Sequence, residues 1–126
     1  MKHFYIPVGI LAVILSFSLW AGRYVELRTE HWTALLEQAD REGRQEDWNA
    51  AREQMDRAYA DWQSSQTFFH IIMDHEELDA AEGLFAGAFA VCEEGDDADF
   101  HQMLAQLIKQ LDLLSETQQA SIRNIL

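Results

Sequence analysis

Cysteine, proline, glycine and basic residues are all scarce in this chain, and these scarcities exclude several classes of protein. The 126 residues include one cysteine, one proline and 6 glycines. A single cysteine, Cys92, excludes an internal disulfide and any CxxC metal or redox motif. The chain has 9 Lys and Arg against 22 Asp and Glu, which gives a formal net charge of −13. Because such a surface repels phosphate backbones, we expect no nucleic-acid partner.

The charges are distributed unevenly along the chain. Residues 1–22 contain one formal charge, on Lys2, so residues 23–126 hold 8 basic and 22 acidic side chains. A length of 126 residues fits one soluble domain at most. We therefore expect two parts, a membrane anchor at residues 1–22 and an acidic helical domain at residues 23–126.

An uncharged stretch, FYIPVGILAVILSFSLWAG, occupies residues 4–22. As a helix it would be about 28 Å long, close to the ~30 Å hydrocarbon core of a bilayer. Phe4, Tyr5 and Ile6 begin the stretch, and Trp20 stands near its end. Tyrosine and tryptophan are amphipathic aromatics that favour the membrane interface. The stretch therefore predicts one transmembrane helix.

A cleaved signal peptide is the alternative, because it also opens with a basic residue and an apolar stretch. Cleavage after Ala21 or Gly22 would place the bulky Leu19 or Trp20 where a small residue is required. We therefore expect a retained, single-pass anchor in the cell membrane. Lys and Arg counts barely differ between its two sides, and the short N-terminal tail favours a soluble domain outside the cytoplasm.

The rest of the chain has helical periodicity and lacks the alternating pattern of strands. No proline follows Pro7. We predict helices over residues 24–42, 47–73, 75–93 and 97–125, the first continuing from the membrane span. Short loops make neighbouring helices antiparallel. The expected fold class is all-α, with one N-terminal transmembrane helix followed by an antiparallel bundle of about four helices.

The same spacing predicts the residues of the core. The expected core positions, in chain order, are Val25, Trp32, Leu35, Leu36, Ala39, Trp48, Ala51, Met55, Ala58, Trp62, Ser65, Phe69, Ile72, Leu78, Ala81, Phe85, Ala88, Cys92, Phe100, Leu104, Leu107, Leu111, Leu114, Gln118, Ile122 and Ile125. Tyr59, Phe68 and Phe89 fall beside these positions. They either widen the apolar stripe or form an exposed contact patch.

Glycine and aspartate residues predict where the helices begin and end. Gly43 is expected to end the first predicted helix in a left-handed conformation, and Gly95 is expected to end the third predicted helix in the same way. Asp74, followed three residues later by Glu77, resembles a capping box that starts the third helix. An aspartate at residues 96–97 can cap the fourth.

The third predicted helix contains two interior glycines, Gly83 and Gly87, among several alanines. Each interior glycine costs about 1 kcal/mol relative to alanine. We expect close approach of a partner helix to compensate, either within this chain or in a second copy. Both glycines are therefore predicted to lie at a tight helix–helix contact.

His70 and Asp74 are the candidates for a metal site, and the acidic clusters at residues 74–79 and 93–99 could attract divalent cations. On a continuous helix His70 and Asp74 share one face, a spacing that can chelate a metal ion. HExxH and EF-hand patterns are absent, and so is a nucleophile motif. We therefore expect His70 to border the core and pair with Asp74, while His75 caps the next helix. No cofactor and no enzymatic activity are expected.

The sequence also resembles two known families. Residues 39–62 resemble the turn and second helix of one tetratricopeptide unit, without a second copy. The residues that support the second likeness are His70, the segment HEEL at residues 75–78, Glu82 and the segment SIRNIL at residues 121–126. With these, the whole chain resembles a family of small bacterial membrane-anchored helical proteins known as a domain of unknown function. The resemblance implies an anchored helical domain and assigns no activity.

These observations favour an interaction or scaffold module that acts through protein–protein contacts at a membrane. Its partner would be another protein or a second copy of the chain. The alternative is a ligand- or metal-binding sensor domain outside the cytoplasm, built from the acidic clusters together with His70 and Asp74.

Overall fold

The computed structural model describes residues 2–125, with the side chains of residues 5–120, 123 and 124. Its helices are α1 (Lys2–Arg44), α2 (Trp48–Ser64), α3 (Gln66–Ile72), α4 (His75–Glu94) and α5 (Asp97–Ile125). No strand occurs within residues 2–125. The prediction of an all-α fold is therefore confirmed. There is one helix more than expected because the predicted helix at 47–73 is divided in two.

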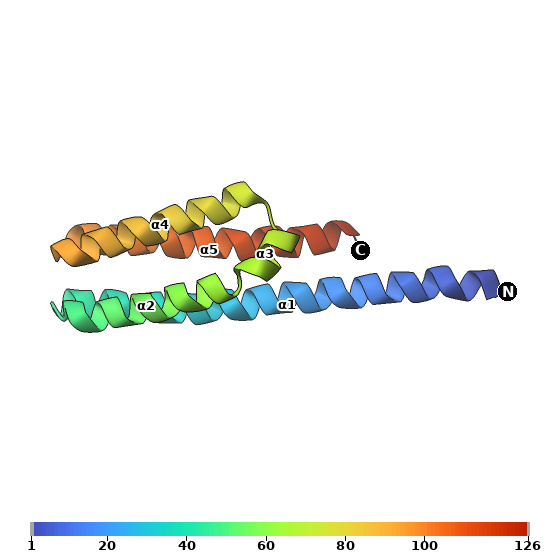
Figure 1. Ribbon diagram of the computed structural model, residues 1–126, viewed down its shortest axis with the longest axis horizontal. Coiled ribbons are helices and arrows are strands. Elements are labelled where there is room, and N and C mark those ends of the chain that lie inside the picture. Colours follow the sequence, from blue (N-terminus) through green and yellow to red (C-terminus); the bar gives the residue numbers. More distant parts are fainter. Residues whose placement is uncertain (1, 126) are drawn as a thin grey trace.

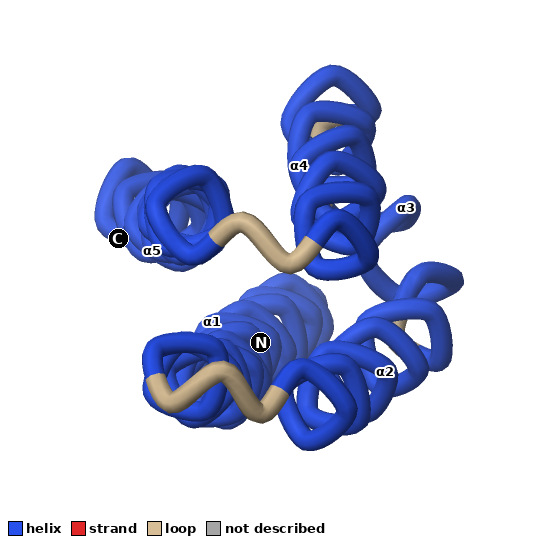
Figure 2. The backbone as a smooth tube through the Cα atoms, turned by 90° about the vertical axis from the view of Figure 1, so that its left-hand side faces the viewer, coloured by secondary structure: helices blue, strands red, loops and turns tan. Residues whose placement is uncertain are grey.

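The helices form an antiparallel bundle in which α1 packs against α2 and α5, and α4 packs mainly against α5. Figure 2 shows this arrangement end-on, with α3 beside the end of α2. In Figure 1 the N-terminal part of α1 projects beyond the other helices. The first helix is therefore shared between the bundle and the projecting apolar segment.

Twenty of the 26 predicted core positions are buried, and Gln118 is partly exposed. Five aromatic residues of the core are fully buried: Trp32, Trp62, Phe69, Phe85 and Phe100. Leu35, Trp48 and Ile72 pack against this core while partly exposed. The side chains of Ile122 and Ile125 lie outside the described residues. Periodicity therefore identified the inward face of every helix in the bundle.

The prediction of one helix over residues 47–73 is wrong because the chain bends at Ser65. The Ser64 and Ser65 hydroxyl groups both donate hydrogen bonds to the Asp61 carbonyl oxygen, at 2.7 and 3.1 Å. Such side-chain bonds compete with the helical backbone ladder. The bend directs α3 across the end of the bundle, where Phe69 fills the core.

The prediction of a left-handed Gly43 is also wrong. Gly43 lies inside α1, and Glu46 adopts the positive φ of 61° in the following turn. A methyl group at Gly43 would come within 2.9 Å of the Phe100 ring. This glycine is therefore required for close packing of α5 against α1. Asp47 caps α2 by accepting a hydrogen bond from the Ala50 backbone N–H.

The ends of α4 follow the sequence prediction in part. Asp74 occupies the N-cap position, but its side chain makes no capping hydrogen bond. Glu77 does not complete a capping box, because its carboxylate accepts a hydrogen bond from Gln110 of α5. Gly95 has the predicted left-handed conformation, with φ 71°. Asp96 begins α5 by accepting a hydrogen bond from the Asp99 backbone N–H.

Candidate functional site

An acidic groove lies between α1 and α5. Its volume is about 320 Å³. We call it the α1–α5 groove. The residues that line it are Glu26, Thr29, Glu30, Thr33, Ala34, Glu37, Asp112, Ser115 and Glu116. Five of these side chains are carboxylates, and no lysine or arginine is among them. The groove therefore presents a concentrated negative charge.

Helical spacing explains how these residues meet. Glu26, Glu30 and Glu37 are four and seven residues apart, so they share one face of α1. Asp112 and Glu116 are four residues apart on α5, which packs against α1 along this face. The pattern is present in the sequence. It could not be recognised there because 22 acidic residues make carboxylate pairs commonplace.

Two buried hydroxyl groups line the same groove. Thr29 is only 4% exposed, and its Oγ1 has no hydrogen-bond partner among the described residues. Thr33 Oγ1 is likewise buried without a partner. The single ion pair at the groove, between Arg23 and Glu26 at 3.3 Å, lies at its edge and is exposed. The other four carboxylates form no ion pair among the described residues.

Two further carboxylates, those of Asp61 and Glu82, accept hydrogen bonds from side chains of a neighbouring helix. Asp61 accepts hydrogen bonds from Arg28 at 2.8 Å and from the Trp32 indole at 2.5 Å, which joins α2 to α1. Glu82 accepts hydrogen bonds from the Tyr59 hydroxyl and, at 2.7 Å, from the Trp62 indole. These bonds join α4 to α2.

The Tyr59 phenol is altered by this arrangement. Its pKa is raised, first because the hydroxyl donates to Glu82 and then because it is partly desolvated. The carboxylates of Asp61 and Glu82 are structural groups, because their hydrogen bonds join neighbouring helices. In the sequence, Glu82 stands out only within a family resemblance, since nothing in its spacing indicates two aromatic donors from another helix.

His70 and Asp74 do not share a helix face. α3 ends at Ile72, and Met73 and Asp74 are extended. His70 instead lies against His75, with their Nδ1 atoms 3.0 Å apart, and both side chains are exposed. The expectation that His70 borders the core and pairs with Asp74 is therefore wrong.

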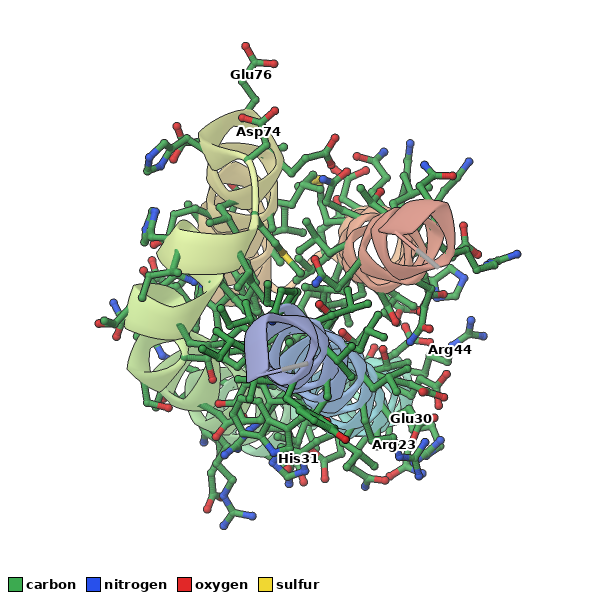
Figure 3. All side chains as sticks on the ribbon, turned by 90° about the vertical axis from the view of Figure 1, so that its right-hand side faces the viewer. Arg23, Glu30, His31, Arg44, Asp74 and Glu76 are labelled. Carbon is green, nitrogen blue, oxygen red and sulfur yellow. The ribbon has the colours of Figure 1, made fainter. Side chains whose placement is uncertain are left out.

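Asp74 lies at the outer edge of the bundle. Figure 3, viewed from the side toward which α1 projects, shows Asp74 and Glu76 there, well away from Glu30. Among the described residues, no three His, Cys, Asp or Glu side chains form a group that could hold a metal ion.

Cys92 faces the core and is 4% exposed. Burial raises the pKa of its thiol, which disfavours the reactive thiolate. The two α4 glycines differ from one another. A methyl group at Gly87 would approach the Met103 Cε of α5 within 2.5 Å, whereas one at Gly83 would meet nothing within 4 Å. Within this chain, only Gly87 lies at the close contact predicted for both.

The predicted anchor residues are exposed along the projecting part of α1. Tyr5 is 70% exposed, Ile6 65% and Trp20 55%. The side chain of Phe4 lies outside the described residues. Within residues 2–125, α1 is the one helix long and apolar enough to cross a membrane. Burial begins at Ala21, so the predicted boundary after residue 22 falls inside a continuous helix.

Comparison with known proteins gives one match. A family described as a domain of unknown function (DUF4363) matches residues 19–125. This region contains the bundle portion of α1 together with α2, α3, α4 and α5. No curated protein and no solved structure matches the chain.

Proposed function

The chain belongs to the DUF4363 family, and from this premise we propose that it is a membrane-anchored interaction module. Its bundle holds a basic segment of a partner protein in the α1–α5 groove. The observation that supports this function is the groove itself, which has five carboxylates and no basic residue in its lining. Lysine and arginine side chains are the groups that such a surface attracts.

Membrane insertion of the anchor is the first part of the proposal. The apolar side chains of residues 5–20 are largely exposed, and a bilayer would remove them from water. Retention of the anchor is favoured over cleavage, because the bonds after Ala21 and Gly22 lie within α1. Both residues are buried, and the Gly22 carbonyl oxygen accepts a hydrogen bond from Gln119 of α5 at 3.4 Å.

The chemistry of the groove favours a basic protein segment over a second copy of this chain. Residues 23–126 hold 22 acidic and 8 basic side chains, so a second copy would repel the groove. Thr29 and Thr33 also line the groove, although their Oγ1 atoms are buried and have no hydrogen-bond partner among the described residues. A Lys/Arg-rich segment would supply both charge and hydrogen-bond donors, and its binding would weaken with salt.

Site-specific photo-crosslinking in cells tests this function. A photo-reactive amino acid replaces Ala34, an exposed residue of the groove, or Ala90, an exposed residue of α4 outside it. We expect position 34 to form an adduct that mass spectrometry maps to a Lys/Arg-rich segment of another protein. Position 90 should not form it. The adduct should diminish when isolated membranes are crosslinked in high salt, because salt screens the attraction.

Neutralising carboxylates of the groove distinguishes binding in the groove from nonspecific electrostatic binding to the acidic surface. The variant Glu30→Gln/Glu37→Gln/Glu116→Gln should lose the adduct at least tenfold. The matched variant Glu53→Gln/Glu76→Gln/Glu94→Gln, whose residues lie outside the groove, should keep it. An adduct unchanged by the first variant, or mapped to a second copy of this chain, would refute the groove as the binding site.

We also propose that the bundle lies outside the cytoplasm. In a Cys92→Ala background, the exposed Gln102 is replaced by cysteine, and intact cells are treated with a membrane-impermeant maleimide. Labelling in intact cells is expected. Labelling only after the cells are lysed would place the bundle in the cytoplasm instead.

A further inference from the structure

One apolar side chain of the bundle is exposed far more than its chemistry favours. Ile71 of α3 is 76% exposed. Among the described residues after Leu27, the only other exposed large apolar side chain is Leu113 of α5, at 41%. Transfer of an isoleucine so exposed from water to an apolar surface is favourable. Its place in the fold indicates which surface covers it.

Helix α3 lies directly beside the end of the anchor. The Phe68 ring packs edge-on against Trp20, with ring centroids 5.5 Å apart, and against Tyr24 at 4.8 Å. Trp20 is the last aromatic residue of the uncharged stretch, and the exposed Arg23 follows it. Figure 1 shows α3 at the end of the bundle from which α1 projects.

The charge distribution around α3 also differs from that of the rest of the domain. Residues 62–73 contain no Asp, Glu, Lys or Arg. The segment that packs beside the anchor therefore carries no formal charge of its own, and the charges that follow it along the chain, on Asp74 and Glu76, lie at the outer edge of the bundle. Aromatic residues with one polar edge, such as Trp20 and Tyr24, are typical of the interface between hydrocarbon and headgroups.

We infer that α3 docks on the bilayer that holds the anchor, with Ile71 inserted at the boundary between headgroups and acyl chains. This inference rests on the membrane insertion proposed above. When the anchor crosses the bilayer, Trp20 sits at the interface, and its contact with Phe68 places α3 at the same level. The bundle is then held against the membrane by two contacts, which restricts its tilt and fixes the direction that the α1–α5 groove faces.

Spin-label accessibility in the full chain tests the docking. Single cysteines replace Val13, Ile71 or Leu113 in a Cys92→Ala background, receive a nitroxide and are reconstituted in phosphatidylcholine nanodiscs. Val13 reports the anchor, and Leu113 is the matched exposed apolar position. Leu113 is six residues from Gln119, which contacts Gly22, and is therefore about 9 Å farther along α5. Collisions with oxygen report lipid, and collisions with a soluble nickel chelate report water.

We expect the labels at positions 13 and 71 to favour oxygen and the label at position 113 to favour the nickel chelate. If position 13 reports lipid while position 71 resembles position 113, docking of α3 is overturned and the anchor stands. If position 13 itself reports water, the anchor and the docking both fail. Because Ile71 and Leu113 are exposed, far-UV circular dichroism of the labelled chains should match that of the unlabelled chain.

Discussion

At the scale of single residues, Glu82 connects α4 to α2. Its carboxylate accepts hydrogen bonds from the Tyr59 hydroxyl and the Trp62 indole, so one α4 side chain satisfies two partly buried α2 donors. A neutral amide in its place would present an N–H₂ group to one of these donors. The lost bond and the unsatisfied donor together cost about 1–3 kcal/mol.

We therefore expect Glu82→Gln to lower the free energy of unfolding by about 1–3 kcal/mol. The matched control is Glu93→Gln. Glu93 forms one exposed ion pair with Arg52, at 2.7 Å, and such pairs contribute little to stability because water and salt screen them. Denaturant unfolding of the full chain in detergent, followed by circular dichroism, measures both. Equal losses in the two variants would show that Glu82 has no special role.

The same bond makes stability depend on alkaline pH. The raised Tyr59 pKa means that the folded chain holds the phenolic proton more tightly than the unfolded chain does. The resulting stability is fully present below the unfolded pKa of about 10 and is lost as pH rises through the folded pKa. We expect the wild type to lose more stability above a pH of about 10 than Glu82→Gln. Parallel pH profiles of the two would contradict this assignment.

Cys92 gives a second residue-scale prediction. Because the side chain is buried and its pKa is raised, the thiol should react with a disulfide reagent slowly in the folded chain. Unfolding in guanidinium should increase the rate at least a hundredfold. The control is Cys92→Ala carrying a cysteine at the exposed position 102, which should react quickly in both states. Fast labelling of native Cys92 would mean that this part of the core opens readily.

At the scale of helices, the buried Gly43 near the end of α1 and the exposed Gly83 inside α4 are expected to respond differently to substitution. A methyl group at Gly43 would come within 2.9 Å of Phe100 Cδ2, near one end of the α1–α5 contact, whereas one at Gly83 would meet nothing within 4 Å. Helix propensity favours alanine by about 1 kcal/mol in a helix interior, which applies to Gly83, whereas Gly43 is next to the last residue of α1. Overpacking a core contact costs about 1–3 kcal/mol.

We expect Gly43→Ala to lower the melting temperature of the chain and Gly83→Ala to raise it or leave it unchanged. Gly87→Ala should have a small effect, because the Met103 atom it would meet is the flexible end of a side chain. Differential scanning calorimetry of the three variants measures this order. A stabilised Gly43→Ala would show that Phe100 moves aside without cost.

Helical periodicity was sufficient to predict the core but not the ends of the helices. Burial along a helix depends on spacing, so positions such as Met55, Phe85 and Leu107 follow from the sequence alone. The bend at Ser65 depends on hydrogen bonds from the Ser64 and Ser65 hydroxyl groups to the Asp61 backbone carbonyl. The packing role of Gly43 depends on the ring of Phe100, which is distant in the sequence. Neither dependence has a local signal. The α1–α5 groove escaped prediction for the same reason, since it requires knowing that the acidic faces of α1 and α5 adjoin.

At the scale of the whole molecule, the bundle must fold against its own charge. Residues 23–126 have 22 acidic and 8 basic side chains, and the α1–α5 groove concentrates five of the carboxylates. Cross-helix ion pairs such as Arg28–Asp61 and Arg52–Glu93 offset part of the repulsion. Because few basic residues are available, most of the negative charge has no such partner. Repulsion therefore outweighs attraction over the bundle surface.

Salt should consequently stabilise the protein. The Debye length shortens from about 30 Å at 0.01 M ionic strength to about 8 Å at 0.15 M, which screens repulsion among the exposed carboxylates. The ion pairs weaken at the same time, but each exposed pair contributes only about 0–1 kcal/mol. We expect the melting temperature to rise by several degrees over this range, equally in sodium chloride and choline chloride. A rise produced only by divalent cations would indicate a specific site instead, and a fall would show that the ion pairs outweigh the repulsion.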